Sequence, residues 1–428
     1  MEIRGGSLLG AALSQILASS QEELVIGFGY PARKPEWALV VKDVRLAGED
    51  EVTRDHYGLH WSGDLTSRLY RAASQRGCGI VLIHAHPGSG RAPRPSKTDR
   101  QTAATTLDHF ATILPDALHA YAVINDNGVA GWAQAGTERR SVDLIHAVQV
   151  PVRKWRQTVP PIAETRERDT RQVAALSEAG IAALRASRIG IVGAGGAGSQ
   201  VAEMLAHAGV GSLVIVDGDK VEPPNLSRTH GTTPRTVGRF KARVIRQFVA
   251  RIDPSITVDA ICEPFPSKRS ITSLRDVDVV VSCVDSPFAR NELNRFCLRY
   301  ALPIVDVGTT ITPDPLAIDG HITRCVPPHG CLRCAGHVSD AILDAWAADE
   351  RNGKYGVDEY RPQVVSFNGL LASAAVTEVL KLVTGFARDG DHSTEWHYDP
   401  MSGELRSIQL PLSNCIDCEW LAMKADTV

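Results

Sequence analysis

Two histidines and an aspartate in "HAHPGSGRAPRPSKTD" (residues 84–99) have the types and spacing of a metal site. His84 and His86 end the apolar run "GIVLIHAH", where strand alternation would place both imidazoles on one face. Asp99 follows a proline-rich turn. Two imidazoles and one carboxylate leave the fourth position of a tetrahedral Zn²⁺ open to water, as in catalytic zinc sites. The stretch therefore predicts a hydrolytic zinc centre.

Such a centre also needs a general base and a donor for the developing oxyanion. The early strand in "SQEELVIGFG" supplies two adjacent carboxylates, of which we choose Glu23 as the base and keep Glu22 as the alternative. Ser96 is the candidate oxyanion donor. A surface loop with scattered histidines also fits the spacing. The surface-loop interpretation does not explain why an apolar strand, an H-x-H-P motif and an S-x-x-D motif occur together in this stretch.

A second candidate site begins at "GAGGAGS", residues 193–199. Gly193, Gly195 and Gly198 form the G-x-G-x-x-G pattern between an apolar run and a helical stretch, with Gly196 inside the same loop. Asp217 ends the next apolar run, about 20 residues on, where a carboxylate can accept hydrogen bonds from ribose hydroxyls. These features predict a bound nucleotide.

Polar and cationic residues downstream help to choose between nucleotides. They are Asp219, Asn225, Arg228 and Lys241. A nicotinamide dehydrogenase fits the glycine loop and Asp217 equally well. The added charges favour ATP and Mg²⁺, because attack on an α-phosphate needs charge neutralisation more than an apolar nicotinamide slot.

Four of the nine cysteines form two C-x-x-C pairs, "CLRC" (Cys331, Cys334) and "CIDC" (Cys415, Cys418). Each pair can supply two thiolates to a tetrahedral structural Zn²⁺, and a redox pair is the alternative for either one alone. Thiolate ligands and an odd cysteine count indicate a reducing compartment, so we expect the cytoplasm.

The remaining composition predicts how the chain is organised. With 428 residues, 43% of them hydrophobic, the chain should form more than one domain. We expect a mixed α/β domain over residues 1–150, a linker over 151–167, and a Rossmann-like domain with a predominantly parallel sheet over 168–428. The net charge of -3 favours neither nucleic acid nor an anionic membrane, and no apolar run approaches the roughly 18 residues of a membrane span.

From about residue 168 onward the sequence resembles the adenylating domain of the ThiF/MoeB/HesA family, which ubiquitin-activating enzymes share. The matching motifs, in order, are "RDTRQ", "GAGGAGS", "AGVGSLVIVDGDKVEPPNLSR", "VGRFKA", "RIDP", "SCVDSPFARNELN" and the paired C-x-x-C. The resemblance implies that ATP adenylates the C-terminal glycine of a ubiquitin-like protein and that pyrophosphate is released.

The same resemblance implies roles for individual residues. Asp217 would hold the ribose, and three residues would handle the phosphates: Asn225, Arg228 and Lys241. Asp285 would help to organise Mg²⁺ and the adenylation geometry. Arg171 resembles an arginine that reaches the γ-phosphate from the other subunit, which implies a homodimer.

The chain departs from many such relatives in one respect. No cysteine lies between Cys334 and Cys415, where relatives place the thiol that receives the activated chain. The adenylate could therefore pass directly to another nucleophile, such as a separate protein's thiol. The hydroxyl of Ser366 is a bolder candidate, and a helix-capping serine is the more ordinary interpretation.

Residues 1–150 resemble JAB/MPN metalloproteases, whose JAMM signature matches "HAHP" and "PSKTD", although the spacer from His86 to Ser96 is two residues longer than usual. This implies cleavage of the bond after a ubiquitin-like C-terminus. The two halves together predict a fused activating and deconjugating enzyme, and leave open whether a conjugating enzyme takes part. The alternatives are activation of a sulfur carrier for thiamin, molybdopterin or cysteine synthesis, and a binding scaffold with both sites inactive.

Overall fold

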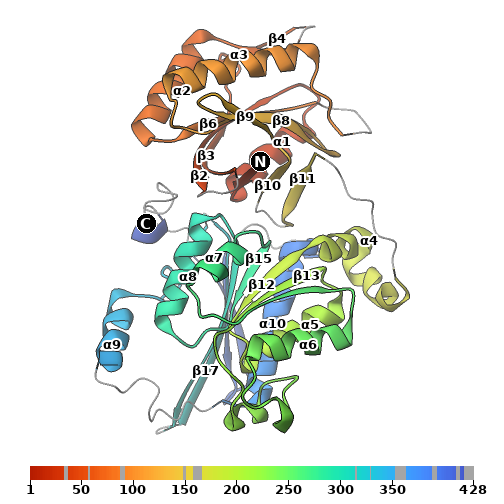
Figure 1. Cartoon of the computed structure of the whole chain (residues 1–428), viewed down its shortest axis with the longest axis vertical. Helices are drawn as coiled ribbons and strands as arrows, with labels where there is room; N and C mark the ends of the chain where they lie inside the picture. Colours follow the sequence, from red (N-terminus) through yellow and green to blue (C-terminus); the bar gives the residue numbers. More distant parts are fainter. Residues whose placement is uncertain are drawn as a thin grey trace. The chain divides into compact units, whose positions relative to one another are not determined.

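The chain forms two compact units, the first mainly from Met1–Pro161 and the second mainly from Ile162–Cys418 (Figure 1). The computed structural model describes all residues except 33–36, 56–57, 87–91, 148–150, 158–165, 314–315, 328, 352–362, 388–392, 411–414 and 419–428. Each unit is an α/β structure built on one large sheet, in agreement with the expected mixture of helices and strands.

The first unit is built on a nine-stranded mixed sheet in the order β11-β10-β1-β3-β2-β6-β7-β8-β9. Its strands are β1 (Glu2–Gly5), β2 (Leu24–Ala32), β3 (Ala38–Leu46), β6 (Gly79–Ala85), β7 (His119–Asn125), β8 (Gly128–Ala135), β9 (Glu138–Ser141), β10 (Leu144–Ala147) and β11 (Arg153–Arg156). A separate hairpin pairs β4 (Val52–Asp55) with β5 (Gly58–Trp61). The helices are α1 (Ser7–Ala18), α2 (Gly63–Arg76) and α3 (Lys97–Ile113).

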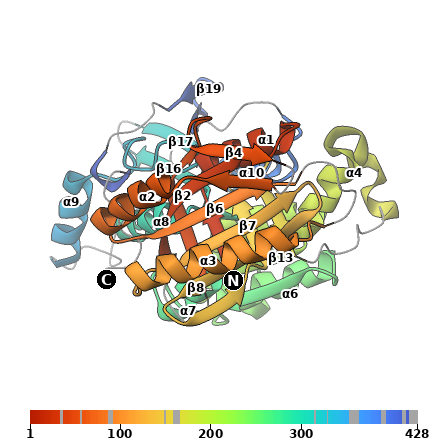
Figure 2. The same cartoon turned by 90° about the horizontal axis from the view of Figure 1, so that it is seen from above.

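Alternation along β6 explains why both faces of this sheet are covered. Val81 and Ile83 pack in a cluster with the apolar face of α1, whereas Ile80 and Leu82 pack with α2 and α3. Side chains two residues apart share a face, so His84 lies on the α2 and α3 side. Figure 2 looks onto that side, with α2 and α3 lying across the strands.

The first unit extends past the predicted boundary at residue 150. Strand β11 pairs antiparallel with β10 and buries Trp155, so the predicted linker begins too early. The prolines and charges of this stretch suggest a linker, but three basic residues and Trp155 form a short edge strand. The buried Trp155 side chain packs this strand onto the unit. Residues 158–165 of the predicted linker lie outside the described residues.

The second unit is built on an eight-stranded sheet in the order β14-β13-β12-β15-β16-β17-β18-β19. Its strands are β12 (Arg188–Val192), β13 (Ser212–Val216), β14 (Thr257–Ile261), β15 (Val279–Ser282), β16 (Ile304–Pro313), β17 (Leu316–Cys325), β18 (Thr394–Asp399) and β19 (Glu404–Gln409). The first five strands in the sheet order pair in parallel and the last three pair antiparallel. The parallel part is the Rossmann-like half that the sequence predicts.

Helices and short 3-10 turns connect these strands. They are η1 (Glu167–Asp169), α4 (Thr170–Ala186), α5 (Gly196–Ala208), η2 (Pro223–Ser227), η3 (Pro234–Thr236), α6 (Lys241–Ile252), α7 (Lys268–Leu274), α8 (Pro287–Arg299), α9 (Asp340–Arg351) and α10 (Val365–Thr384). In parallel sheets, ligands bind at the carboxyl ends of the strands. The loops after β12, β13 and β15 are therefore the place to look for a site.

Helix α10 is long and apolar enough to cross a membrane by length and composition alone, contrary to the expectation that no apolar run approaches that length. Half of its most apolar window is buried, and the helix packs on α5, α4, β16 and β17. Its Glu378 forms a buried ion pair with Arg324 of β17, 2.9 Å apart. These contacts are those of a core helix.

Candidate functional site

The glycine loop joins β12 to α5, as the sequence predicts. Gly193 has φ +91°, and a Cβ there would lie 2.5 Å from the carbonyl oxygen of Cys283. A Cβ on Gly198 would lie 1.8 Å from the carbonyl of Gly193, and one on Gly196 would lie 2.2 Å from Asn368 Nδ2. A Cβ on Gly195 would meet nothing within 4 Å. At Gly193, Gly196 and Gly198 the close packing of the loop leaves no room for a side chain. Gly195 instead faces open space that a phosphate could enter.

Asp217 lies directly after β13 and is tied to the glycine loop. Its carboxylate accepts hydrogen bonds from the backbone N–H of Ala194, at 2.6 Å, and of Asp219, at 2.8 Å. Burial raises the pKa of Asp217, and the nearby Lys241 acts in the opposite direction. Each carboxylate oxygen can accept a second hydrogen bond, so Asp217 remains able to bind a hydroxyl group.

Lys241 begins α6 and joins this cluster. Its Nζ lies 2.8 Å from Asp219 Oδ2. Burial alone would lower the pKa of Lys241, but the carboxylates of Asp217, Asp219 and Asp285 outweigh it and raise the pKa. Asp285 is exposed in the loop after β15. One cation and three carboxylates thus gather at the edge where β13 and β15 end.

Two further predicted phosphate residues lie in η2, which follows β13. Asn225 is buried, and its Oδ1 accepts a hydrogen bond from the N–H of Glu222 at 3.0 Å, which caps the turn. Arg228 Nη1 donates to the carbonyl of Pro224 at 2.8 Å. In the described part of the chain, both side chains make their recorded hydrogen bonds within this turn. Their roles toward phosphate stay predictions.

Arg171 lies exposed in the first turn of α4. Its motif is anchored by its neighbours: fully buried Asp169 pairs with Arg166 and Arg185, and Arg168 pairs with Asp253 at 2.9 Å. Among the described residues, no recorded contact joins Arg171 to the glycine loop of its own chain. A role in another subunit stays a prediction.

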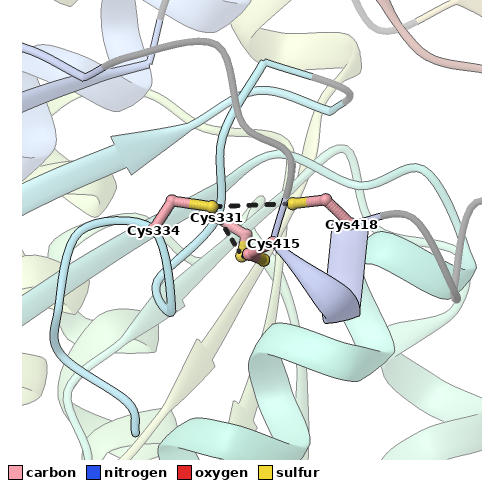
Figure 3. Close-up of side chains that lie close together, drawn as sticks. All are labelled: Cys331, Cys334, Cys415 and Cys418. Atoms are coloured by element: carbon pink, nitrogen blue, oxygen red, sulfur yellow. Dashed lines mark hydrogen bonds between the residues drawn. The ribbon is translucent and has the colours of Figure 1, made fainter.

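The two C-x-x-C pairs converge, although 84 residues separate them (Figure 3). Their sulfur atoms lie 3.5 Å apart for Cys331 and Cys334, 3.6 Å for Cys331 and Cys415, and 3.8 Å for Cys334 and Cys418. A tetrahedral Zn²⁺ with bonds of about 2.3 Å requires sulfur separations of about 3.8 Å. The four thiols therefore fit a structural zinc ion.

Ser366 is exposed at the second residue of α10. The N-cap of that helix is Val364, and no side-chain hydrogen bond caps it. The capping interpretation of Ser366 is therefore wrong, because the helix begins two residues earlier than a Ser366 N-cap would require. Its role as an acceptor stays a prediction.

In the first unit, the predicted metal ligands lie together. His84 Nε2 and His86 Nε2 are 3.2 Å apart, and they lie 3.3 and 3.4 Å from the two carboxylate oxygens of Asp99. Burial acts to raise the pKa of Asp99, but hydrogen bonds from His84, His86 and Ser96 prevail and hold that pKa far below its usual range. Strand β6 supplies the histidines, and the first turn of α3 supplies the carboxylate.

The glutamate beside these histidines is Glu22, which corrects the choice of Glu23. Glu22 Oε1 lies 3.8 Å from His86 Nε2, and Glu22, His84 and His86 form a group that could hold a metal ion. Successive residues of an extended chain point to opposite sides, so only one of the two glutamates can face the site. Sequence alone could not decide which one.

Ser96 acts as the N-cap of α3. Its Oγ accepts from the N–H of Asp99 at 3.0 Å, and its own N–H donates to Asp99 Oδ2 at 2.6 Å. This capping box orients the Asp99 carboxylate toward the histidines. The oxyanion role of Ser96 stays a prediction. Residues 87–91 of the long spacer lie outside the described residues.

Sequence reasoning missed Tyr121 of β7. Its ring lies 5.5 Å from that of His84, and burial together with the nearby charges of Asp99 and Glu22 raises its pKa. Tyr121 is opposite Leu82 in the parallel pair of β6 and β7 and so shares the face of His84. Only knowledge of that strand pairing could have revealed it.

Comparison with known proteins identifies the second unit. Residues 169–419, more than half of the chain, match the ThiF family. The chain belongs to the ThiF family. The second unit is thus an adenylyltransferase domain of this family, and the match lies outside the residues that carry the predicted JAMM motif.

Three curated ThiF-family relatives give the range of similarity. The chain is 29% identical to the Molybdopterin-synthase adenylyltransferase of Escherichia coli over 231 residues, which is 53% of this chain and 85% of the relative. It is 32% identical to the Sulfur carrier protein ThiS adenylyltransferase of Escherichia coli over 35% of this chain and 57% of the relative. It is 29% identical to the Adenylyltransferase and sulfurtransferase UBA4 of Meyerozyma guilliermondii over 46% of this chain and 43% of the relative.

A solved structure agrees with the fold. The Microcin C7 biosynthetic enzyme MccB in complex with N-formylated MccA matches with a TM-score of 0.51 over 61% of this chain and 77% of that chain. At 20% sequence identity this likeness shows the fold alone.

Proposed function

We propose that the ThiF unit adenylates the C-terminal carboxylate of a small sulfur-carrier protein that ends in glycine. A carboxylate oxygen attacks the α-phosphorus of ATP, a new P–O bond forms, and pyrophosphate leaves with the electron pair of the broken bond. Relatives whose names include molybdopterin synthase and the sulfur carrier ThiS support a sulfur carrier over a protein modifier. A conjugating enzyme is therefore not required.

The observation that carries this proposal is the convergence of Gly195, Asp217, Lys241 and Asp285 where parallel strands end. The open side of Gly195 and the free N–H groups of α5 suit the phosphates. Asp217 would accept hydrogen bonds from the ribose. Lys241 would neutralise charge that develops around the α-phosphorus, and Asp285 would hold Mg²⁺, which adds positive charge there.

Three more assignments belong to the same proposal. Asn225 and Arg228 would contact the phosphates once ATP draws their side chains from η2. Arg171 would reach the γ-phosphate of a second subunit, so the active form would be a homodimer. The cysteine set would hold one structural Zn²⁺, and thiolate ligands favour the reducing cytoplasm.

ATP–pyrophosphate exchange tests the proposal. We expect candidate carriers that end in glycine to stimulate exchange and the same carriers without that glycine to fail. Lys241→Ala should abolish the stimulation, whereas the exposed neighbour Lys220→Ala is the matched control. Stimulation that does not depend on the terminal glycine would overturn the carrier assignment.

Mass spectrometry of the carrier separates the two fates of the adenylate. With a sulfide donor present, a sulfur carrier should gain the mass of one oxygen-to-sulfur replacement at its C-terminus. Attachment of the carrier to lysines of other proteins would instead support the modifier interpretation.

A second function is proposed for the first unit because Glu22, His84, His86 and Asp99 lie together. Imidazole and carboxylate donors suit Zn²⁺, which would lower the pKa of a bound water molecule. His84, His86 and Asp99 would hold the ion, and Glu22 would take the proton from the water. The proposed reaction is hydrolysis of the peptide or isopeptide bond after the carrier's terminal glycine.

Cleavage of a carrier with an extended C-terminal tail tests this second function. The wild-type chain loaded with Zn²⁺ should release the tail, and His84→Ala should not. His60→Ala, in the separate β4–β5 hairpin, is the matched control. Equal cleavage by wild type and His84→Ala would overturn the proposal.

A further inference from the structure

A buried polar cluster lies behind the loop that carries Asp285. At its centre is Asp306 of β16, which is fully buried. Its carboxylate accepts hydrogen bonds from Ser282 Oγ at 2.5 Å, from Arg290 Nε at 3.0 and 3.1 Å, and from His321 Nε2 at 3.0 Å. Burial acts to raise the pKa of Asp306, but Arg290, His321 and Ser282 hold it far below the usual range, so the carboxylate stays ionised.

Arg290 connects this carboxylate to the loop. While its Nε binds Asp306, its Nη2 donates to the carbonyl oxygen of Val284 at 2.8 Å. Strand β15 ends at Ser282, and the N–H of Cys283 makes the last recorded ladder bond, to the carbonyl of Val192. Beyond that point, the Arg290 side chain binds the Val284–Asp285 peptide through the Val284 carbonyl.

His321 is itself held in place from two sides. A Cβ on Gly308 would lie 2.1 Å from its ring, so the glycine makes room for the imidazole. The ring of His337 stacks on it with centroids 3.7 Å apart and planes 14° apart. His337 Nε2 in turn lies 2.8 Å from Thr323 Oγ1 and 3.1 Å from Glu395 Oε1. The Asp306 carboxylate therefore has little freedom to turn.

A buried, fully paired carboxylate costs desolvation energy, and in some proteins its benefit is one fixed geometry rather than stability. The geometry fixed here is that of the peptide group that joins Val284 to Asp285. Because Asp285 acts on Lys241 electrostatically, a change of that peptide would move a carboxylate of the adenylation edge.

We propose that Arg290, Asp306 and His321 are positioning residues for adenylation, which hold the Val284–Asp285 peptide so that Asp285 faces the ATP phosphates. The inference rests on the proposed adenylation. None of the three needs to touch the substrate. Their effect should appear in the chemical step, because the glycine loop and Asp217, which would bind the nucleotide, lie on other strands.

Steady-state pyrophosphate exchange with Arg290→Lys tests the proposal. Lysine keeps the charge but cannot bind Asp306 and the Val284 carbonyl together through a rigid fork. We expect kcat to fall by about 10- to 100-fold, the effect of a misplacement of about 1 Å, with the KM for ATP within about twofold of wild type. Arg295→Lys, on the same helix but half exposed, should match wild type.

Two further variants separate positioning from folding. His321→Gln keeps a side-chain donor toward Asp306 and should retain most of kcat, whereas His321→Leu should lose it to the extent of Arg290→Lys. Tight binding of a non-hydrolysable ATP analogue by all variants confirms that the unit folds. Unchanged kcat in Arg290→Lys, or equal loss in both His321 variants, would overturn the inference. Absence of exchange by the wild-type chain would instead overturn the proposed function.

Discussion

The two units build their candidate sites in different ways. In the first unit, one strand and the next helix supply three ligands from within residues 84–99, and one carboxylate, Glu22, comes from just before β2. In the ThiF unit, the residues come from the ends of β12, β13 and β15 and the start of α6. The local site can be predicted from a short motif. The distributed site can be predicted in part from the glycine loop and Asp217, and the order of the family motifs along the chain adds Asp285.

The chemistry of the two clusters differs as well. The first unit surrounds one carboxylate with two imidazoles, a donor set that suits Zn²⁺. The ThiF unit surrounds one lysine with three carboxylates, and oxygen donors suit Mg²⁺. If this contrast is correct, each site can be disabled without affecting the other.

The largest expected effect is the loss of exchange in Asp285→Asn. Removing the charge that would hold Mg²⁺ should lower carrier-dependent exchange by about 1,000-fold, comparable to the loss of a main electrostatic contributor. Tail cleavage by the first unit should stay within about twofold of wild type. Exposed Asp276→Asn, in the turn before β15, is the control. Normal exchange in Asp285→Asn would show that the carboxylate has been assigned the wrong role.

The second effect concerns the base of the first unit. Glu22→Gln should lower cleavage of a tail-extended carrier by about 100-fold or more, because general-base catalysis typically contributes 10²–10⁴-fold. Its neighbour Glu23→Gln supplies the matched control and should cleave normally. The reverse pattern, measured in the same cleavage assay, would restore Glu23 as the base and contradict the geometry.

Zinc content distinguishes the two sites. The wild-type chain should bind two zinc ions, and His86→Ala and Cys415→Ser should each lose one. Cys415→Ser should also lower the Tm of the ThiF unit by about 5 °C or more, since structural zinc contributes folding energy and about 1 kcal/mol corresponds to about 2–4 °C at this size. Metal analysis and calorimetry measure both quantities. Loss of both ions in either single variant would contradict two separate sites.

The smallest expected effect is a pH dependence of the first unit to which His119 contributes. Burial lowers the pKa of His119 to about 4, and its ring lies 3.1 Å from the N–H of Ile80, which donates to Nδ1. Between about pH 6.5 and pH 4 the unfolded chain binds a proton that the folded unit excludes, so stability is lost as pH falls through this window. At pH 5 the loss would be about 2 kcal/mol.

Hydrogen exchange at β6 measures this loss, compared with exchange at β12 in the ThiF unit. After correction for intrinsic rates, protection of β6 should fall from pH 7 to pH 5 in the wild type and fall less in His119→Asn. Equal pH dependence in both proteins would contradict the assignment to His119.

Much of both sites could be predicted from sequence because their residues follow buried strands. His84, His86 and Asp99 have the spacing of a strand followed by a helix start, and Gly193 and Asp217 lie at consecutive strand ends. Alternation along a strand determines which side of the sheet each side chain faces. The parallel sheet then brings the carboxyl ends of its strands to one edge. The charges downstream of the glycine loop indicate Lys241, and the family resemblance adds Asp285.

The remainder depended on pairing that no local pattern encodes. Glu22 and Tyr121 reach the histidines because β2 and β7 flank β6. Asp306 meets His321 because β16 and β17 pair antiparallel. This pairing sets Asp306 opposite Thr323, two residues along β17 from His321, within reach of the imidazole. Strand β11 escaped prediction because a single buried tryptophan anchors it.

The most direct test of the central claim is intact mass spectrometry of a glycine-ended carrier incubated with ATP and the full chain. The ThiF unit should add AMP to the carrier's C-terminus and release pyrophosphate. The adduct should be absent with Asp285→Asn and present with His84→Ala. Release of ADP and phosphate without an AMP adduct, or an adduct on a carrier without its terminal glycine, would contradict the account.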